Sequence, residues 1–191
     1  MSDIIVILGK TRSGKDSIAE VVLREIPNSI KLKFADPFKR YTEQAYGLPA
    51  GALELQEYRD AIVPGTSHTF LDLMIFSYQA YDAFDPLFWK QHTFQLIEQE
   101  LLKGTTLVLT DVRHPLEAKY MAALANAHRL ILVSVYKSGC PSIASDASLG
   151  ANFEMLSYVT DDIYSYINDG TLCHLQNWSS WMCRDVLRNT K

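Results

Sequence analysis

The sequence that decides the fold is IIVILGKTRSGKDS, residues 4–17. Its first five residues are apolar and mostly β-branched, which is typical of a strand buried on both faces of a parallel sheet. From Lys15 onward the apolar residues take helical spacing, with Ile18, Val22 and Ile26 on one side. The stretch therefore predicts a strand, a glycine-containing loop and a helix in direct succession.

The loop between this strand and helix has the pattern Gly-x-x-x-x-Gly-Lys. In this pattern successive backbone amides and the helix N-terminus surround a phosphate, and the lysine reaches the outer phosphates of a nucleotide. Asp16 stands where the general motif has Ser or Thr, and a hydroxyl follows at Ser17. The alternative, a glycine-rich turn with a chance lysine, is disfavoured by the flanking strand and helix. We expect nucleotide phosphates to contact Gly9, Thr11, Arg12, Ser13, Gly14, Lys15, Asp16 and Ser17.

The rest of the chain alternates strands with helices, which favours an α/β fold with a parallel sheet of about five strands covered by helices on both faces. Further strands are predicted at 30–34, 105–110, 129–136 and 163–167. Helices are predicted at 36–46, 53–59, 68–81, 86–103, 115–125 and 172–187. Asp36 and Pro37 predict an N-cap and a first helical position, and residues 82–85 predict a turn. We expect one domain, 1–191, with a helical insertion at about 48–103 and a lid-like loop at about 137–152, rich in Gly, Ser, Ala and Pro.

Two charged residues follow the predicted strand at 105–110. Asp111 and Arg113 would lie at the edge of the sheet where parallel strands end and ligands bind. Asp111 is predicted to hold magnesium through water or to orient a substrate, and Arg113 to bind a phosphate. Asp16 and Ser17 are the other candidates for contacts to metal-bound water. The alternative for Asp111 and Arg113 is a helix cap with a surface ion pair.

Composition narrows the possible partners. The 191 residues carry a formal net charge of −4, so no overall positive field attracts a nucleic-acid polymer. Neither a signal peptide nor an apolar run long enough to span a membrane is evident, which predicts a cytoplasmic protein without a membrane partner. Cys140, Cys173 and Cys183 lack zinc-site spacing and are expected to be reduced thiols.

Several segments, in matching order, resemble the bacteriophage deoxynucleoside monophosphate kinases. They are RSGKDS at 12–17, FADPFK at 34–39, FDPLFW at 84–89, TDVR at 110–113 with Glu117, and INDGTL at 167–172. The resemblance implies a P-loop kinase fold, ATP with Mg²⁺, and transfer of the γ-phosphoryl group to a small deoxynucleoside monophosphate. It also implies the host cytoplasm as location if the chain is phage-encoded, and it leaves the accepted base, the sugar preference and a homodimer open.

The resemblance assigns roles to further residues. The insertion would bind the acceptor, with Phe34, Asp36 and Lys39 lining its pocket and Trp89 lying against its base. Arg113 and Glu117 would hold the phosphate and sugar of the acceptor, and the catalytic set would be Lys15, Arg12, Asp111 and Arg113. From the residues alone, Trp89 is equally well a core aromatic, and Lys39 equally well belongs to a solvated helix face.

Two departures from that family bear on the identity of the acceptor. Residues 69–74 and 138–152 contain no arginine, although the family has arginine ahead of the tryptophan segment and in its lid. Lys10, Arg12 or Lys137 would have to replace the lid arginine. A kinase for a non-nucleotide phosphate stays open, because animal phosphomevalonate kinases have a similar Arg-x-Ser-Gly-Lys-Asp loop. A non-catalytic sensor that binds ATP stays open as well.

Overall fold

The computed structural model of the chain describes residues 2–140 and 146–189. The chain forms two compact units, Met1–Lys33 with Ile97–Lys191 and, separately, Phe34–Leu96. The second unit overlaps the insertion predicted at 48–103, whose function stays a prediction. Residues 141–145 of the predicted lid-like loop lie outside the described residues. Among the described helices, none combines the length and the apolar character that crossing a bilayer requires.

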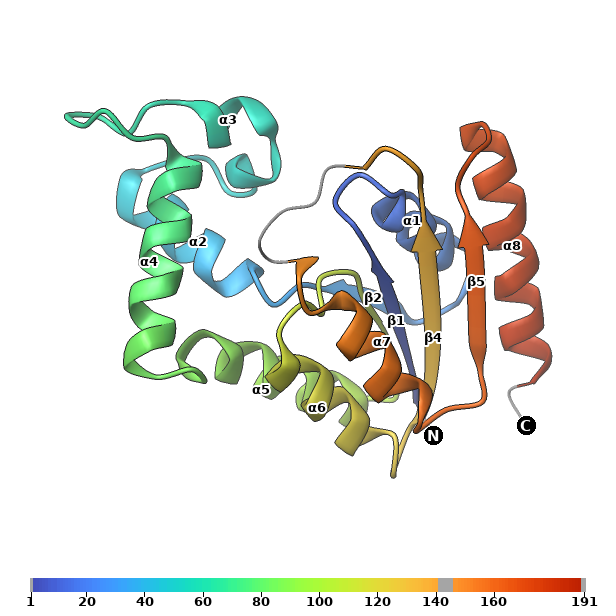
Figure 1. The fold of residues 1–191 in the computed structure, drawn as a ribbon. Helices are drawn as coiled ribbons and strands as arrows, with labels where there is room; N and C mark the ends of the chain where they lie inside the picture. Colours follow the sequence, from blue (N-terminus) through green and yellow to red (C-terminus); the bar gives the residue numbers. More distant parts are fainter. Residues whose placement is uncertain (1, 141–145, 190–191) are drawn as a thin grey trace. The chain divides into compact units, whose positions relative to one another are not determined.

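The first unit contains a five-stranded sheet in which every strand is parallel to its neighbours (Figure 1). The strand order is β2-β3-β1-β4-β5. This confirms the predicted fold class. The strands are β1 (Asp3–Gly9), β2 (Ser29–Leu32), β3 (Thr106–Leu109), β4 (Arg129–Tyr136) and β5 (Ile163–Ile167).

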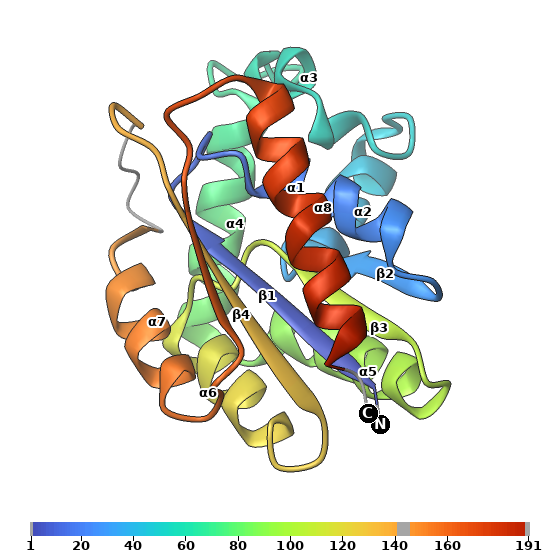
Figure 2. The same ribbon diagram turned by 90° about the vertical axis from the view of Figure 1, so that its right-hand side faces the viewer.

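Strand β1 lies at the centre of the sheet because its apolar residues are buried on both faces. Figure 2 shows α1 (Lys15–Glu25) and α8 (Leu172–Arg188) on one side of the sheet, and α6 (Pro115–Leu124) and α7 (Leu149–Ser157) on the other. The core beneath α1 and α8 includes Ile5, Ile7, Ile18, Val22, Val133, Leu175 and Met182. The parallel strands therefore bring the loop after β1 to one edge of the sheet together with the segments that follow the other four.

The second unit is helical. It holds α2 (Asp36–Tyr46), a 3-10 turn η1 (Ala52–Glu54), α3 (Gln56–Asp60), α4 (Phe70–Phe84) and the first part of α5 (Phe88–Leu102). Its core consists of Phe38, Leu53, Val63, Phe70, Met74 and Trp89. The buried carboxylate of Glu43 accepts the backbone N–H groups of Gly51 (3.0 Å) and Leu53 (2.9 Å), which holds the turn η1 against α2.

Three local predictions differ from the structure. The N-cap of α2 is Ala35, so Asp36 and Pro37 already lie in the first helical turn. The turn predicted at 82–85 is wrong, since α4 continues to Phe84 and Asp85 then accepts the backbone N–H of Leu87 at 2.9 Å. Helix α7 was not predicted, and it begins inside the range 137–152 that the composition marks as a loop.

Candidate functional site

The loop after β1 is shaped by backbone contacts and by two glycines. The N–H of Ser13 donates to the carbonyl oxygen of Lys10 at 3.1 Å, and α1 begins directly after Gly14. Gly14 has a φ of 105°, and a Cβ there would lie 2.7 Å from Nδ2 of Asn168. A Cβ on Gly9 would lie 2.4 Å from the carbonyl oxygen of Val135. Both positions therefore require glycine, as the predicted phosphate-binding loop does.

The turn after β5 braces this loop. The side-chain N–H of the buried Asn168 donates to the carbonyl oxygen of Ser13 at 2.8 Å, and the backbone N–H of Asn168 donates to the carbonyl oxygen of Tyr136 at 2.7 Å. Asn168 thus fixes the carbonyl next to Gly14 and leaves the amides of the loop to other partners. The residues Asn168, Asp169 and Gly170 predict a turn by themselves, but only the resemblance at 167–172 connected this turn with the site.

Lys15 is the first residue of α1, and its side chain is buried although it carries a charge. Only 6% of the residue is exposed, and Nζ donates to the carbonyl oxygen of Lys10 at 2.7 Å. Burial, followed by repulsion from the Arg113 guanidinium, lowers the pKa of Lys15 to about 8. Among the described residues, no carboxylate is a hydrogen-bond partner of Lys15 Nζ, so this buried ammonium would gain from a bound anion.

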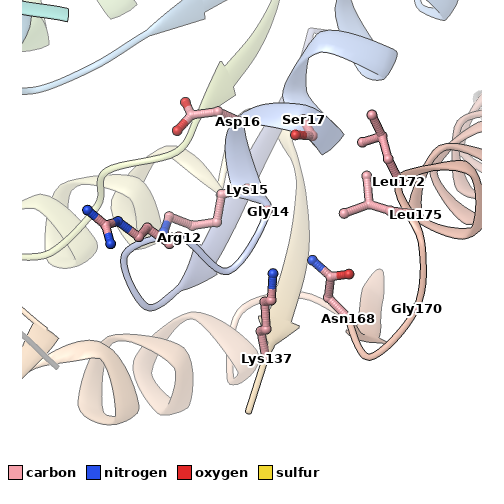
Figure 3. A pocket seen from close by; sticks show the side chains of 10 residues that line it. All are labelled: Arg12, Gly14, Lys15, Asp16, Ser17, Lys137, Asn168, Gly170, Leu172 and Leu175. Atoms are coloured by element: carbon pink, nitrogen blue, oxygen red, sulfur yellow. The ribbon is translucent and has the colours of Figure 1, made fainter. Parts of the chain in front are cut away.

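A cavity of about 360 Å³ opens beside the loop (Figure 3). The N-terminus of α1 and the cationic side chains form its polar part, and two leucines of α8 form an apolar wall. Its lining residues are Arg12, Gly14, Lys15, Asp16, Ser17, Lys137, Asn168, Gly170, Leu172 and Leu175. The cavity suits a ligand with an anionic group at one end and an apolar ring at the other.

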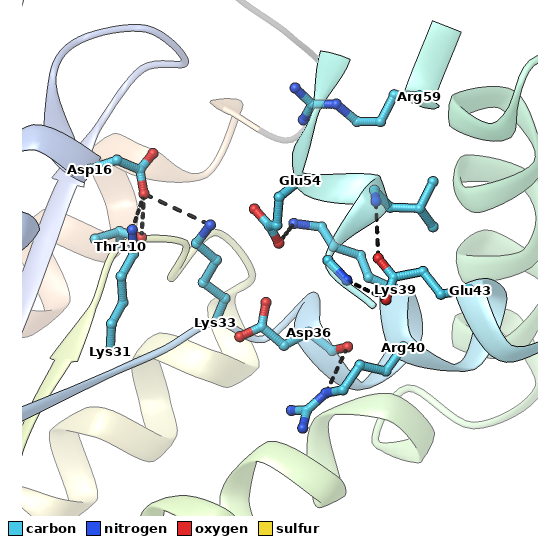
Figure 4. Close-up of polar contacts among 12 residues, drawn as sticks. Asp16, Lys31, Lys33, Asp36, Lys39, Arg40, Glu43, Glu54, Arg59 and Thr110 are labelled. Atoms are coloured by element: carbon cyan, nitrogen blue, oxygen red, sulfur yellow. Dashed lines mark hydrogen bonds and ion pairs between the residues drawn. The ribbon is translucent and has the colours of Figure 1, made fainter. Parts of the chain in front are cut away.

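The carboxylate of Asp16 accepts hydrogen bonds from residues in β2 and directly after β3 (Figure 4). Its Oδ1 accepts from Lys31 Nζ at 2.5 Å and from the Thr110 hydroxyl at 3.4 Å, and it lies 3.8 Å from Lys33 Nζ. Burial opposes the ionised form of Asp16, but Lys31, Lys33 and Lys15 outweigh burial and lower the pKa of its carboxyl. The sequence analysis missed both lysines, although they lie within the strand predicted at 30–34; the observed β2 ends at Leu32, directly before Lys33.

Arg113 reaches the loop from the segment after β3. Its Nη1 donates to Asp146 Oδ1 at 3.0 Å, and its Nη2 lies 3.5 Å from the Thr11 hydroxyl. The side chain of Asp146 has no exposed surface. The structure therefore brings Arg113 together with the predicted loop residues, and it adds Asp146, which sequence reasoning did not single out. Asp111, two residues earlier, is partly buried at the same edge of the sheet.

Glu117 is buried at the start of α6. Its Oε2 accepts the backbone N–H groups of Arg113 at 2.8 Å and His114 at 3.0 Å. These contacts cap the helix and fix the backbone that carries Arg113. The role in sugar binding that the resemblance implies stays a prediction.

The predicted acceptor residues of the second unit are placed as follows. Trp89 is 7% exposed, and it packs edge-on against Phe38 at a ring distance of 5.1 Å, as a core residue of this unit. Lys39 pairs with Glu54 at 2.6 Å. The carbonyl oxygen of Asp36 accepts from Arg40 at 3.4 Å, and the Phe34 ring contacts Phe94. Contact of these residues with a substrate stays a prediction.

The residues at the loop are compatible with a Mg²⁺ ion bound mainly through phosphates. Within residues 2–140 and 146–189, no three His, Cys, Asp or Glu side chains group as a dedicated metal site. Mg²⁺ on a nucleotide needs only one or two protein oxygens, with water and phosphate supplying the rest. Ser17, which lines the cavity, and Asp111 can supply such oxygens. Oδ1 of Asp16 is already engaged by lysine.

Comparison with known proteins gives solved structures only, since no family model and no curated protein matches the chain. A gluconokinase from Sinorhizobium meliloti 1021 is 12% identical, with coverage of 98% of this chain and 94% of that chain and a TM-score of 0.46. A tunicamycin resistance protein from Deinococcus radiodurans is 11% identical, with coverage of 97% and 96% and a TM-score of 0.49. A dephospho-CoA kinase from Campylobacter jejuni is 10% identical, with coverage of 98% and 95% and a TM-score of 0.47. These similarities do not bear on the substrate. The parallel sheet and the glycine loop after its central strand define an α/β fold of the P-loop type.

Proposed function

We propose that this chain is an ATP-dependent kinase that transfers the γ-phosphoryl group of ATP to a deoxynucleoside monophosphate, giving ADP and a deoxynucleoside diphosphate. The observation that carries the proposal is the buried Lys15 ammonium in a glycine loop beside the cavity of about 360 Å³. The choice of acceptor rests on the resemblance of the sequence segments to the phage kinases.

ATP would occupy the cavity with its phosphates on the loop. The amides of the loop and the N-terminus of α1 would bind the β-phosphate, and Lys15 would exchange the carbonyl oxygen of Lys10 for the β- and γ-phosphate oxygens. Leu172 and Leu175 would contact the adenine ring. Ser17 and Asp111, with Asp16 through water, would hold Mg²⁺, which when bound neutralises charge on the transferring group.

Phosphoryl transfer requires that the two reactants be held in line and that their negative charge be neutralised; it does not require a general base from the protein. An oxygen of the acceptor phosphate, already deprotonated at neutral pH, bonds to the γ-phosphorus as the bond from that phosphorus to the β,γ-bridging oxygen breaks. The electron pair of that bond goes to ADP. Arg113, held at the loop by Asp146, would stabilise the equatorial oxygens in the transition state, and Arg12 is the other guanidinium on the loop.

Coupled ADP release tests the proposal, with dAMP, dGMP, dCMP and dTMP as acceptors and phosphomevalonate beside them. We expect acceptor-dependent ADP with at least one deoxynucleotide, and loss of that activity in Lys15→Ala. Activity with phosphomevalonate alone would replace the acceptor and keep the reaction class. ATP binding by calorimetry without any acceptor-dependent ADP would indicate a sensor, and near-normal turnover of Lys15→Ala would refute the assigned role of the loop.

A further inference from the structure

Strand β5 is the last strand of the sheet, and within the described residues it pairs with β4 alone (Figure 1). The carbonyl oxygen of Asp162 and the backbone N–H of Asn168 bond to β4, at 2.9 and 2.7 Å. In a parallel pair, residues that bond to one neighbour alternate with residues whose backbone groups point the other way. The backbone groups of Ile163, Ser165 and Ile167 therefore point away from β4, toward the open edge of the sheet.

This edge lacks the features that usually keep an edge strand from pairing with another chain. Such strands are commonly protected by a charged side chain, a proline or a bulge. The strand β2, at the opposite end of the sheet, carries Lys31. The sequence of β5 is IYSYI, residues 163–167, without a charge, a proline or a glycine. The composition of β5 therefore suits a strand that is covered by a partner.

The surface around β5 is apolar over the area that a homodimer needs. Trp181 on α8 lies beside the strand, with its ring 6.2 Å from that of Tyr164. With about half of each side chain exposed and about 200 Å² for a large side chain, the five apolar residues named below offer roughly 500 Å². A standard interface buries about 800 Å² per partner, of which about 65% is apolar in homodimers, or about 500 Å². These residues are between 39% and 80% exposed, and they are Tyr158, Val159, Ile163, Ile167 and Trp181.

The strand is also complementary to itself, because IYSYI reads the same in both directions. A two-fold axis at Ser165 would set two copies of β5 antiparallel, as an interface between identical chains requires. Ile163 would then lie opposite Ile167 of the second copy, and these residues and Ser165 would exchange backbone hydrogen bonds through the groups that point outward. Tyr164 would lie opposite Tyr166 of the second copy, an aromatic pair of the kind that stabilises adjacent strands.

We propose that two copies of this chain form a dimer through β5, paired antiparallel about Ser165, so that the sheet continues from one copy into the other. The dimer goes beyond the proposed function and does not depend on it. One feature limits its strength, since the exposed Asp161 would face Asp169 of the second copy at each end of the paired strands. Like charges that face each other destabilise strand pairing, so we expect a Kd in the range of about 1–100 μM.

Sedimentation velocity of the nucleotide-free chain, at about 1–200 μM protein, tests the dimer and its register. Ser165→Lys places two ammonium groups opposite each other on the two-fold axis, so the dimer should weaken at least about tenfold. Asp161→Lys replaces repulsion from Asp169 of the second copy with attraction at both ends, so the dimer should strengthen at least about threefold. Gln99→Lys adds a positive charge on an exposed position of α5, and it should change the Kd less than about twofold.

A chain that stays monomeric over the whole concentration range would overturn the proposal. So would a dimer that Ser165→Lys leaves unchanged, because its interface would lie elsewhere. Weakening by both Ser165→Lys and Asp161→Lys would indicate strand pairing in another register, which contradicts the proposed two-fold axis. Salt gives a further readout, since screening should strengthen the wild-type dimer and weaken that of Asp161→Lys. Circular dichroism of each variant checks that a change in association does not come from unfolding.

Discussion

Replacing the buried lysine should stabilise the protein while abolishing its activity. The pKa of Lys15 is lowered from 10.5 to about 8, so holding the ammonium form costs the folded state about 3 kcal/mol at pH 7. Lys15→Met removes that cost and keeps an apolar side chain of similar length, but it loses the hydrogen bond to the Lys10 carbonyl, worth about 1 kcal/mol. The net gain is about 2 kcal/mol, or about 4–8 °C in Tm for a chain of this size.

The sign of the pH dependence follows from the same shift. The pKa in the folded state lies below that of the unfolded chain, so the unfolded chain binds more protons between pH about 8 and 10.5. The stability of the wild-type protein therefore rises with pH in this window relative to Lys15→Met. The cost at Lys15 falls to about 2 kcal/mol at pH 9, so the advantage of the variant should shrink by about 1 kcal/mol between pH 7 and pH 9.

Urea unfolding without nucleotide, at pH 7 and pH 9, measures this difference. Lys119→Met is the matched control, since that lysine is exposed on α6 and its loss should leave the free energy of unfolding nearly unchanged. A Lys15→Met protein that is less stable than the wild type at pH 7 would refute the reasoning. So would a difference between the two proteins that stays constant from pH 7 to pH 9.

Two further changes address the loop and its arginine. Gly14→Ala places a Cβ 2.7 Å from the Asn168 amide at a φ of 105°, so MgATP affinity should fall at least about tenfold, with about 2 kcal/mol of stability lost, in calorimetry and thermal melts. Gly47→Ala, at a φ of 63° with no atom within 4 Å, should cost only about 1 kcal/mol and spare binding. Asp146→Asn leaves the Arg113 guanidinium beside a neutral amide, and kcat should drop about tenfold while the Kd of MgATP changes less than about twofold. An unchanged kcat would remove Asp146 from the site.

The sheet could be predicted because its strands carry strong local signals, whereas helix α7 depends on tertiary contacts. Residues 149–157 contain Gly150 and Asn152, which have low helix propensity. The helix is stabilised by packing on α6 and by burial of Asn152 and Leu156, which no local pattern reveals. The turn predicted at 82–85 failed for a related reason, because Asp82 is engaged by the buried Lys90 at 2.5 Å and the helix continues past it.

The candidate site also has one part that could be predicted from the sequence and another part that could not. The loop could be found from spacing alone, since each residue from Gly9 to Lys15 is a sequence neighbour of the next. The ion pairs could not, because Lys31 lies 15 residues from Asp16 and Asp146 lies 33 residues from Arg113. Only the strand order brings such partners together. Trp89 illustrates a different limit. The sequence alone does not distinguish an aromatic residue of a helix that packs in the core from one that contacts a ligand.

The hydrogen bond from Asn168 to Ser13 joins residues that are 155 positions apart. On the ribosome, at about 5–20 residues per second, about 8–30 s pass between synthesis of the two partners. The central strand β1 is made before β3 and β4, the strands that flank it, and its glycine loop is not braced until Asn168 has been synthesised. The binding loop is therefore fully formed only late in translation. Nucleotide binding then stabilises the finished chain and does little to stabilise the nascent chain.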